Sequence, residues 1–150
     1  MVHYEGIFFD KKTQDYIISL DKNKLPVLND EIHCTFKPKP TNEELFYELL
    51  GQEIEIELIG YGSDGKNSGF EVKIPEKYMK YYINYEEEDP TKLKIPHITT
   101  SISEDSKAYL TKNLNFISLD SPIKVTGKFA YWIKEEDGTE YLTYEKQKKY

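Results

Sequence analysis

Two copies of the pattern His-x-Thr contain the residues of this chain best suited to chemistry. His33 and Thr35 lie in the segment EIHCTF, and His97 and Thr99 lie in PHITTSI, although the chain has only three histidines. A histidine pair can supply one general base and one general acid, because the unperturbed imidazole pKa lies close to neutrality. The threonine hydroxyls can donate to non-bridging phosphoryl oxygens, where charge gathers in the transition state. The pattern therefore favours phosphoryl chemistry without a metal.

The spacing has a structural meaning in a β-strand, where residues i and i+2 point to the same face. Each motif strand then has one face that carries the histidine and the threonine, here called the chemical face, and one face that packs in the core. Both imidazoles meet in one cleft if the two strands lie side by side or about a pseudo-two-fold axis. For a single copy, a solvent-facing histidine beside a β-favouring threonine is the plain alternative. The His-x-Thr motif occurs twice, each time between a proline-containing loop and a capped helix. This repetition favours a paired catalytic site over a coincidence. The chemical faces are Glu31, His33, Thr35 and Lys37, and His97, Thr99, Ser101 and Ser103.

The first half of the chain is predicted to surround its motif with a strand, a helix and a hairpin. Thr41 and Glu44 form a capping box before leucines that share a helix face, and Gly51 can end that helix in the left-handed conformation. Apolar residues then alternate strictly with glutamates over 53–59, as in a half-buried strand. The expected elements are a strand over 4–10, a loop over 20–30, a helix over 41–52 and a hairpin over 53–74.

The second half repeats this plan. Ser103 or Asp105 can cap a helix over 103–114. The segments 122–133 and 139–144 are expected to form a closing hairpin. Each half therefore contains a His-x-Thr strand, a helix and a hairpin, which is a duplication of structure and not of sequence.

Composition limits the ligands that this chain can bind. Its 150 residues suffice for one well-buried core and about one domain. The net charge is −7 and there is no arginine, so the bidentate guanidinium fork for phosphate is missing. We expect no long duplex nucleic acid as a partner, because charge runs such as 135–137 are acidic where a basic stripe is required. A small anionic ligand needs only local positive potential and hydrogen-bond donors.

Targeting and cofactor signals are absent from the sequence. No apolar run approaches the roughly 18 residues of a membrane span, and the start at Met1 lacks a basic region followed by an apolar stretch. We therefore expect a cytoplasmic protein without a membrane partner. Cys34, the single cysteine, falls on the apolar face of its strand and is expected to be a small buried side chain. The histidines lack zinc or iron spacing, so we expect no metal and no cofactor.

Four further side chains are candidates for substrate binding. Lys37 can neutralise phosphate charge, and Ser101 lies on the chemical face of the second strand. Tyr4 and Trp132 can stack on a base. The alternatives are a solvated lysine and aromatic core packing. The loop 60–69 has the glycines and amides of an anion nest, with a plain hairpin tip as its alternative.

The segments HCTF and HITT resemble the signature of the 2H phosphoesterase superfamily, a pair of His-hydrophobic-Thr/Ser-hydrophobic motifs. HCTF matches all four positions, whereas HITT ends in Thr100, where the family usually has an apolar residue. The stretches HCTFKP, IGYGSDGKNSGFEV and HITTSIS look most like the branch related to the cyclic phosphodiesterase domain of fungal-type tRNA ligases, also called Swiss-army-knife RNA repair-like.

The resemblance implies an α+β fold with two pseudosymmetric lobes of antiparallel strands and flanking helices around a central cleft. The chain would be a single domain, 1–150, with lobes of roughly 1–75 and 76–150. His33 and His97 become the acid/base pair, in either order, and Thr35 and Thr99 the phosphate ligands.

The activity implied is metal-independent hydrolysis of a small nucleotide phosphodiester: a 2′,3′-cyclic phosphate, a 2′-5′ linkage or a cyclic oligonucleotide. Superfamily relatives include phage proteins that destroy the cyclic oligonucleotide signals of bacterial CBASS immunity, and enzymes that cut 2′-5′ oligoadenylates. A binding protein of the same fold that sequesters a nucleotide without turnover is the alternative. A repair protein acting on RNA termini would share the chemistry with a larger substrate. Oligomeric state is left open.

Overall fold

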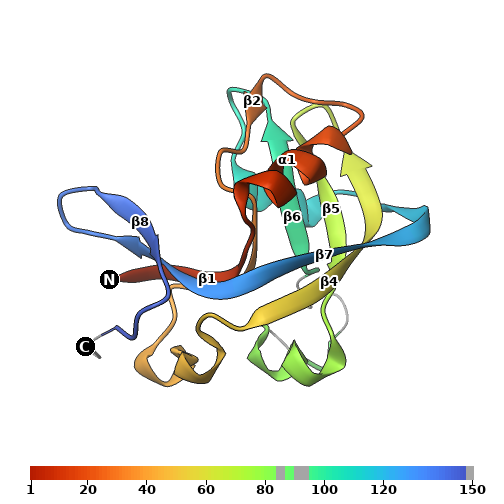
Figure 1. Ribbon diagram of the computed structural model, residues 1–150. Coiled ribbons are helices and arrows are strands. Elements are labelled where there is room, and N and C mark those ends of the chain that lie inside the picture. The colour runs from red at the N-terminus through yellow and green to blue at the C-terminus, as the bar shows by residue number, and fades with distance from the viewer. Residues whose placement is uncertain (84–86, 90–94, 148–150) are drawn as a thin grey trace.

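The computed structural model describes residues 1–83, 87–89 and 95–147, which form a mostly antiparallel sheet with few helices (Figure 1). This is an α+β architecture. The strands are β1 (Val2–Phe8), β2 (Val27–Leu28), β3 (His33–Pro38), β4 (Glu53–Ser63), β5 (Asn67–Lys73), β6 (His97–Ile102), β7 (Ile117–Lys134) and β8 (Glu140–Thr143). The helical elements are α1 (Lys11–Ser19) and the 3₁₀ turns η1 (Asn42–Glu44), η2 (Tyr47–Leu49), η3 (Glu76–Tyr81) and η5 (Ala108–Asn113).

Both predicted hairpins are confirmed. In β4 the apolar residues Ile54, Ile56 and Leu58 are buried, while the intervening glutamates face outward. β4 returns through a short tip into β5, and β7 turns into β8 at Gly138, whose φ of 90° suits glycine.

The helix predicted over 41–52 is wrong in type, because this segment forms the two 3₁₀ turns η1 and η2. The capping box of Thr41 and Glu44 is nevertheless present. In an α-helix the amide of Phe46 would bind the carbonyl four residues earlier. It donates instead to the carboxyl group of the buried Glu5 at 3.3 Å, so a contact with β1 interrupts the helical ladder.

The helix predicted over 103–114 is also wrong in type and extent. The hydroxyl of Ser103 donates to Asp105 at 2.6 Å, and Asp105 pairs with Lys66 at 2.9 Å. Neither residue caps a helix, and the 3₁₀ helix η5 begins later, at Ala108.

The α-helix α1 was not predicted from the sequence. It begins after Asp10, whose carboxylate accepts a hydrogen bond from the amide of Thr13 at 2.8 Å. Aspartate is a preferred N-cap residue, and Ile17 is the buried residue of the helix. The N-cap aspartate is the signal that would have located α1.

One sheet joins the strands in the order β2-β6-β5-β4-β7-β1-β3, with β8 beside β7. The two long strands β4 and β7 pair at its centre, and each His-x-Thr strand lies beyond one intervening strand. The order β6-β5-β4 on one side therefore mirrors β3-β1-β7 on the other. Strands from the two halves of the chain are interleaved, so the expected boundary near residue 75 does not divide the sheet.

The two His-x-Thr strands pair with their neighbours in the same register. Gly6 of β1 lies opposite Thr35, and Gly69 of β5 lies opposite Thr99. A Cβ on either glycine would come within 2.2 Å of the carbonyl oxygen between the histidine and the threonine. Only glycine permits such a close approach of two backbones.

Each His-x-Thr strand also contains a β-bulge at the same position. The register shifts directly after the threonine, so that Phe36 in β3 and Thr100 in β6 have no partner on the neighbouring strand. An extra residue bends the strand and changes which side chains face each side of the sheet.

The two motif strands come into contact, although they lie far apart in the strand order. Asn29, just before β3, bridges them: its side-chain amide donates to the carbonyl of Thr99 at 2.8 Å and its backbone amide to that of Thr100 at 2.9 Å. Figure 1 shows β5 and β6 crossing the direction of β1 and β7, as a strongly curved sheet requires. None of the described helices is long and apolar enough to cross a membrane. The core includes Ile7, Ile32, Cys34, Phe36, Phe129 and Tyr131.

Candidate active site

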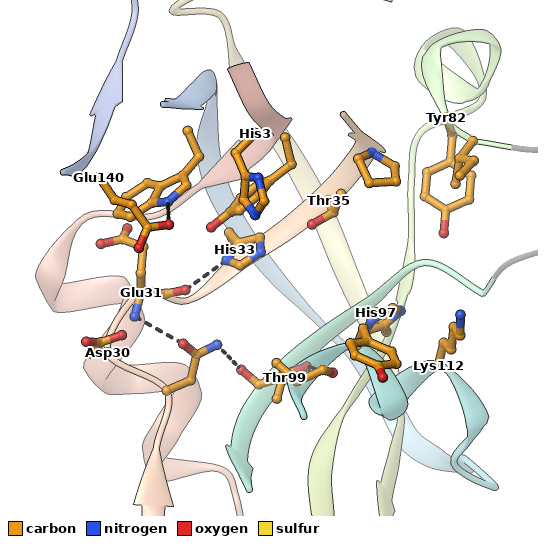
Figure 2. Close-up of a pocket in the computed structure, with 17 residues that line it drawn as sticks. His3, Asp30, Glu31, His33, Thr35, Tyr82, His97, Thr99, Lys112 and Glu140 are labelled. Carbon is orange, nitrogen blue, oxygen red and sulfur yellow. Dashed lines mark hydrogen bonds between the residues drawn. The ribbon is translucent and has the colours of Figure 1, made fainter. Parts of the chain in front are cut away.

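A cavity of about 590 Å³ contains both His-x-Thr motifs (Figure 2). His33 and Thr35 reach it from β3, and His97 and Thr99 reach it from β6. Cys34, between the first pair, points the other way and is fully buried, as predicted. The contact between β3 and β6 thus brings the four residues together.

Both imidazoles are held in the same way. Nδ1 of His33 donates to the carbonyl of Glu31 at 2.8 Å, and Nδ1 of His97 donates to the carbonyl of Ile95 at 2.8 Å. A carbonyl oxygen only accepts, so Nδ1 carries the proton of the neutral ring. Nε2 is therefore a base when the ring is neutral and an acid when it is charged.

Two aromatic rings from β1 stack on His33, and a third ring, from β7, packs beside them. The Tyr4 ring stacks on the imidazole at 4.6 Å and 21°, and the Phe8 ring lies at 5.4 Å and 19°. Trp132 lies nearly parallel to Tyr4 at 6.0 Å and donates to Glu140 at 3.1 Å. Tyr4 and Trp132 both line the cavity.

Burial shifts the titration of both histidines. It lowers the pKa of His33 to about 4, against a smaller opposing effect of the hydrogen bond to Glu31, and the nearby His97 lowers it further. Burial also lowers the pKa of His97, and the charge of Lys112 adds to this. Both shifts favour the neutral form of the ring at pH 7. A bound anion would favour the charged form of either ring.

The two threonines differ in their hydrogen bonds. Among the described residues the hydroxyl of Thr35 has no hydrogen-bond partner, whereas Oγ1 of Thr99 donates to the carbonyl of Ala108 at 3.0 Å. Oγ1 of Thr99 is also 2.8 Å from that of Thr111, which accepts from Asn67 at 3.0 Å. A hydroxyl has a single proton, so Thr35 can donate to a ligand while the proton of Thr99 is committed to η5.

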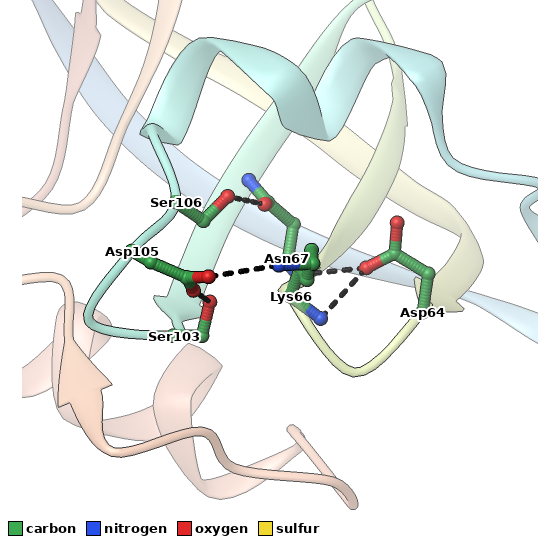
Figure 3. A network of polar contacts seen from close by, with 6 residues as sticks. All are labelled: Asp64, Lys66, Asn67, Ser103, Asp105 and Ser106. Atoms are coloured by element: carbon green, nitrogen blue, oxygen red, sulfur yellow. Dashed lines mark hydrogen bonds and ion pairs between the residues drawn. The ribbon is translucent and has the colours of Figure 1, made fainter.

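A polar network joins the tip of the β4–β5 hairpin to the segment that precedes η5 (Figure 3). The side chain of Asn67 accepts from the hydroxyl of Ser106, and Lys66 pairs with Asp105 at 2.9 Å. At the tip of the β4–β5 hairpin, Asp64 accepts from the amides of Lys66 at 2.9 Å and Asn67 at 2.8 Å. The tip amides that suggested an anion nest are thus bound by a carboxylate of the chain itself.

Lys37 and Ser101, two predicted binding residues, do not line the cavity. Nζ of Lys37 lies 3.6 Å from the carboxylate of Glu44, and Ser101 is fully buried and donates to Asp21 at 2.7 Å. Their predicted orientation is wrong because the bulge after each threonine reverses the alternation of the strand.

Asp21 is a buried anchor of β6 that the sequence analysis missed. Its carboxylate accepts from the hydroxyls of Thr100 at 2.9 Å and Ser101 at 2.7 Å, from the amide of Asn23 at 3.2 Å, and from the hydroxyl of Tyr61. Thr100 is the residue that departs from the apolar position of the 2H pattern. It is fully buried, and its hydroxyl is satisfied there because two acceptors, Asp21 and the carbonyl of Ser68, lie within 3.0 Å of it and can share its proton.

Charged side chains are distributed unevenly around the cavity. Figure 2 shows Asp30, Glu31 and Glu140 on the side of His33, and Lys112 on the side of His97. Lys112, Tyr82 and Asn29 were not predicted from the sequence, because they stand in or beside 3₁₀ turns and loops whose residues show no strand or helix periodicity. An Asn-Asp pair before the first motif was the available signal for a turn at Asn29.

Comparison with known proteins found no family model that matches the sequence and no curated protein that is significantly similar to it. A function for this protein must therefore be inferred from the geometry of the site. Over 1–83, 87–89 and 95–147, no group of three or more His, Cys, Asp or Glu side chains is placed to bind a metal ion.

Proposed function

We propose that this protein is a metal-independent phosphodiesterase of the 2H type, with His33 and His97 as its acid/base pair and a small nucleotide phosphodiester as its substrate. One observation carries the proposal: both imidazoles line one cavity, and each directs Nδ1–H to the carbonyl two residues earlier. Two Nε2 atoms, one in each motif, are thereby left for a ligand. Matched tautomers of this kind suit a reaction that needs one base and one acid.

The reaction that fits is hydrolysis. A neutral histidine takes a proton from water at Nε2 while the water oxygen forms a bond to phosphorus. The bond between phosphorus and the leaving ribose oxygen breaks, and that oxygen receives the proton from Nε2 of the second, charged histidine. The product is a phosphate monoester and an alcohol, and the two histidines have exchanged protonation states.

The lowered pKa values place a condition on this cycle. Both shifts favour neutral rings at pH 7, so the acid form must be stabilised by the bound substrate. A phosphodiester anion does this by its charge. The hydroxyl of Thr35, without a partner among the described residues, is the motif donor available to that anion.

The repeated register supports the finer fold of the 2H family. The mirrored orders β3-β1-β7 and β6-β5-β4, the paired glycines and the two equivalent bulges support two pseudosymmetric lobes. Their pseudo-two-fold axis would pass between β4 and β7. In this arrangement the lobe of β3, from the first half of the chain, takes its long strand β7 from the second half. The lobe of β6, from the second half, takes its long strand β4 from the first half.

The cavity limits the size of the substrate. Its volume of about 590 Å³ lies within the range of small-molecule sites, roughly 300–1,000 Å³. This supports a 2′,3′-cyclic mononucleotide, a short 2′-5′ oligonucleotide or a cyclic oligonucleotide as substrate. It argues against a duplex, and the acidic composition argues in the same direction.

The test is an activity screen in the presence of a chelator. Wild type, His33→Ala and His97→Ala are assayed against 2′,3′-cyclic mononucleotides, 2′-5′ and 3′-5′ oligoadenylates, and cyclic di- and trinucleotides. Each substitution is expected to lower the rate by about 10³-fold, within the usual range for general acid–base catalysis. His3→Ala is the matched comparison, because His3 also lines the cavity but stands outside both motifs, with its ring against Tyr4. We expect this variant to lose less than about tenfold in rate. Binding without turnover, unchanged by either substitution, would instead establish a sequestering protein.

A further inference from the structure

Tyr82 is a buried side chain whose hydroxyl meets the cavity. The residue is only 4% exposed, and its ring packs edge-on against Phe36 at 6.1 Å. Figure 2 shows the hydroxyl directed into the cavity, toward the region of His97 and Lys112. It has no hydrogen-bond partner among the described residues. Its oxygen is not among the fully buried polar atoms that lack a partner, so it is accessible from the cavity. A hydroxyl in this position can donate its proton to a ligand.

Lys112 brings positive charge to the same region. It is the only lysine among the described residues that line the cavity, and its ammonium forms no ion pair with a described residue. Its Nζ lies 5.8 Å from the ring centroid of Tyr109. The ammonium is close enough to His97 to disfavour its protonation. An anion bound here would be attracted by the Lys112 ammonium and could accept a hydrogen bond from the Tyr82 hydroxyl.

The opposite side of the cavity would repel an anion. Asp30, Glu31 and Glu140 line it there, and Glu140 already accepts from the indole of Trp132. Thr99 offers no free proton, because its hydroxyl donates to Ala108. The phosphate role that the motif implies for Thr99 therefore lacks a donor in this geometry.

These observations lead us to propose that the Tyr82 hydroxyl and the Lys112 ammonium form an anion-binding subsite for a phosphoryl group beside His97. Thr99 acts instead as a positioning residue that holds η5, which carries Lys112. The phosphoryl group of the substrate then lies at the Lys112 end of the cavity. The nucleoside extends along Tyr4 and Trp132 toward the carboxylates. The inference rests on the proposed function for the identity of the ligand, but anion binding requires no turnover.

The subsite would stabilise the transition state as well as the bound substrate. Negative charge grows on the non-bridging oxygens as water attacks, and donors already aimed at them need no reorganisation. Removal of one such donor typically lowers kcat by about 10²–10³-fold. Tyr82 and Lys112 would thus be catalytic residues outside both His-x-Thr motifs.

The first experiment uses inorganic phosphate as the probe, titrated into the full chain by calorimetry. Tyr82→Phe and Lys112→Gln are each expected to weaken phosphate binding by about tenfold or more, equivalent to about 1.4 kcal/mol. Tyr81→Phe on η3 and Lys107→Gln beside η5 are the matched controls, because neither residue lines the cavity. Thermal unfolding verifies that all four variants fold like wild type. Unchanged affinity in Tyr82→Phe and Lys112→Gln, or no binding to wild type at millimolar phosphate, would overturn the subsite.

A second readout separates this inference from the proposed function. If phosphate binding depends on Tyr82 and Lys112 but no phosphodiester is hydrolysed, the subsite stands and the catalytic proposal fails. If His33→Ala abolishes hydrolysis while Tyr82→Phe and Lys112→Gln retain full kcat and KM, the catalytic proposal stands and the subsite is overturned. Loss of kcat in both variants, with the controls unchanged, supports the two together.

Discussion

Asp21 is the buried carboxylate on which the bulged end of β6 depends. It accepts from the amide of Asn23 and the hydroxyls of Tyr61, Thr100 and Ser101. Asp21→Asn preserves the volume but replaces one acceptor oxygen by an NH₂ donor, so at least one of these donors loses its acceptor. A buried group left without a partner costs about 1–3 kcal/mol, and a hydrogen bond to a charged group contributes about 1.5–3 kcal/mol. We therefore expect the free energy of unfolding to fall by roughly 2–3 kcal/mol.

Urea unfolding at pH 7, followed by circular dichroism, measures this change. Asp15→Asn is the control, because Asp15 makes an exposed ion pair with Lys11 at 2.7 Å, and such helix pairs contribute about 0.3–0.5 kcal/mol. Should Asp21→Asn not fold, Ser101→Ala removes one donor and leaves the carboxylate, with an expected loss of about 1–2 kcal/mol. A loss below about 1 kcal/mol for Asp21→Asn would refute the reasoning, because it would mean that the network relaxes or admits water.

The remaining predictions concern pH. Catalysis needs one neutral and one protonated imidazole, and burial lowers the pKa of His33 to about 4 and that of His97 below its usual 6.5. We therefore expect kcat/KM to peak below pH 6.5. A value of kcat/KM that rises from pH 7 to pH 8 would contradict this protonation scheme. Burial raises the pKa of Glu5 from 4.5 to about 8. Between these values the folded state keeps a proton that the unfolded state has lost, so this carboxyl makes stability fall as pH rises, by at most about 1.4 kcal/mol per pH unit. Glu5→Gln should remove this pH dependence of stability. Relative to wild type, the variant should therefore be more stable at pH 8 than at pH 5, as measured by urea unfolding. A difference in free energy of unfolding that is the same at both pH values would exclude the raised pKa of Glu5.

Much of the candidate site follows from local chemistry. The two-residue period of an extended strand is a property of the backbone itself, so the sequence sufficed to direct His33 and Thr35 to one side of β3 and Cys34 to the other. The same period in β4 correctly separated its isoleucines from its glutamates. Hairpin turns were also accessible, because Gly138 and its neighbours specify a tight turn by their own conformational preferences.

The tertiary structure decided what local chemistry leaves open. Lys37 and Ser101 turn away from the cavity because each strand bulges after its threonine, and the bulges form against Gly6 and Gly69, which belong to other strands. The predicted helix near Phe46 breaks for a similar reason, since its amide binds a carboxyl group on β1.

The cavity itself shows the same division. The residue types and their spacing in the sequence were enough to determine that two imidazoles, those of His33 and His97, are available on strand faces. That they meet, and that Tyr82 and Lys112 stand beside one of them, depends on β3 and β6 coming into contact across a curved sheet. Such contacts join residues far apart in the chain, and no local preference of the backbone or side chains encodes them; the folded sheet brings them about.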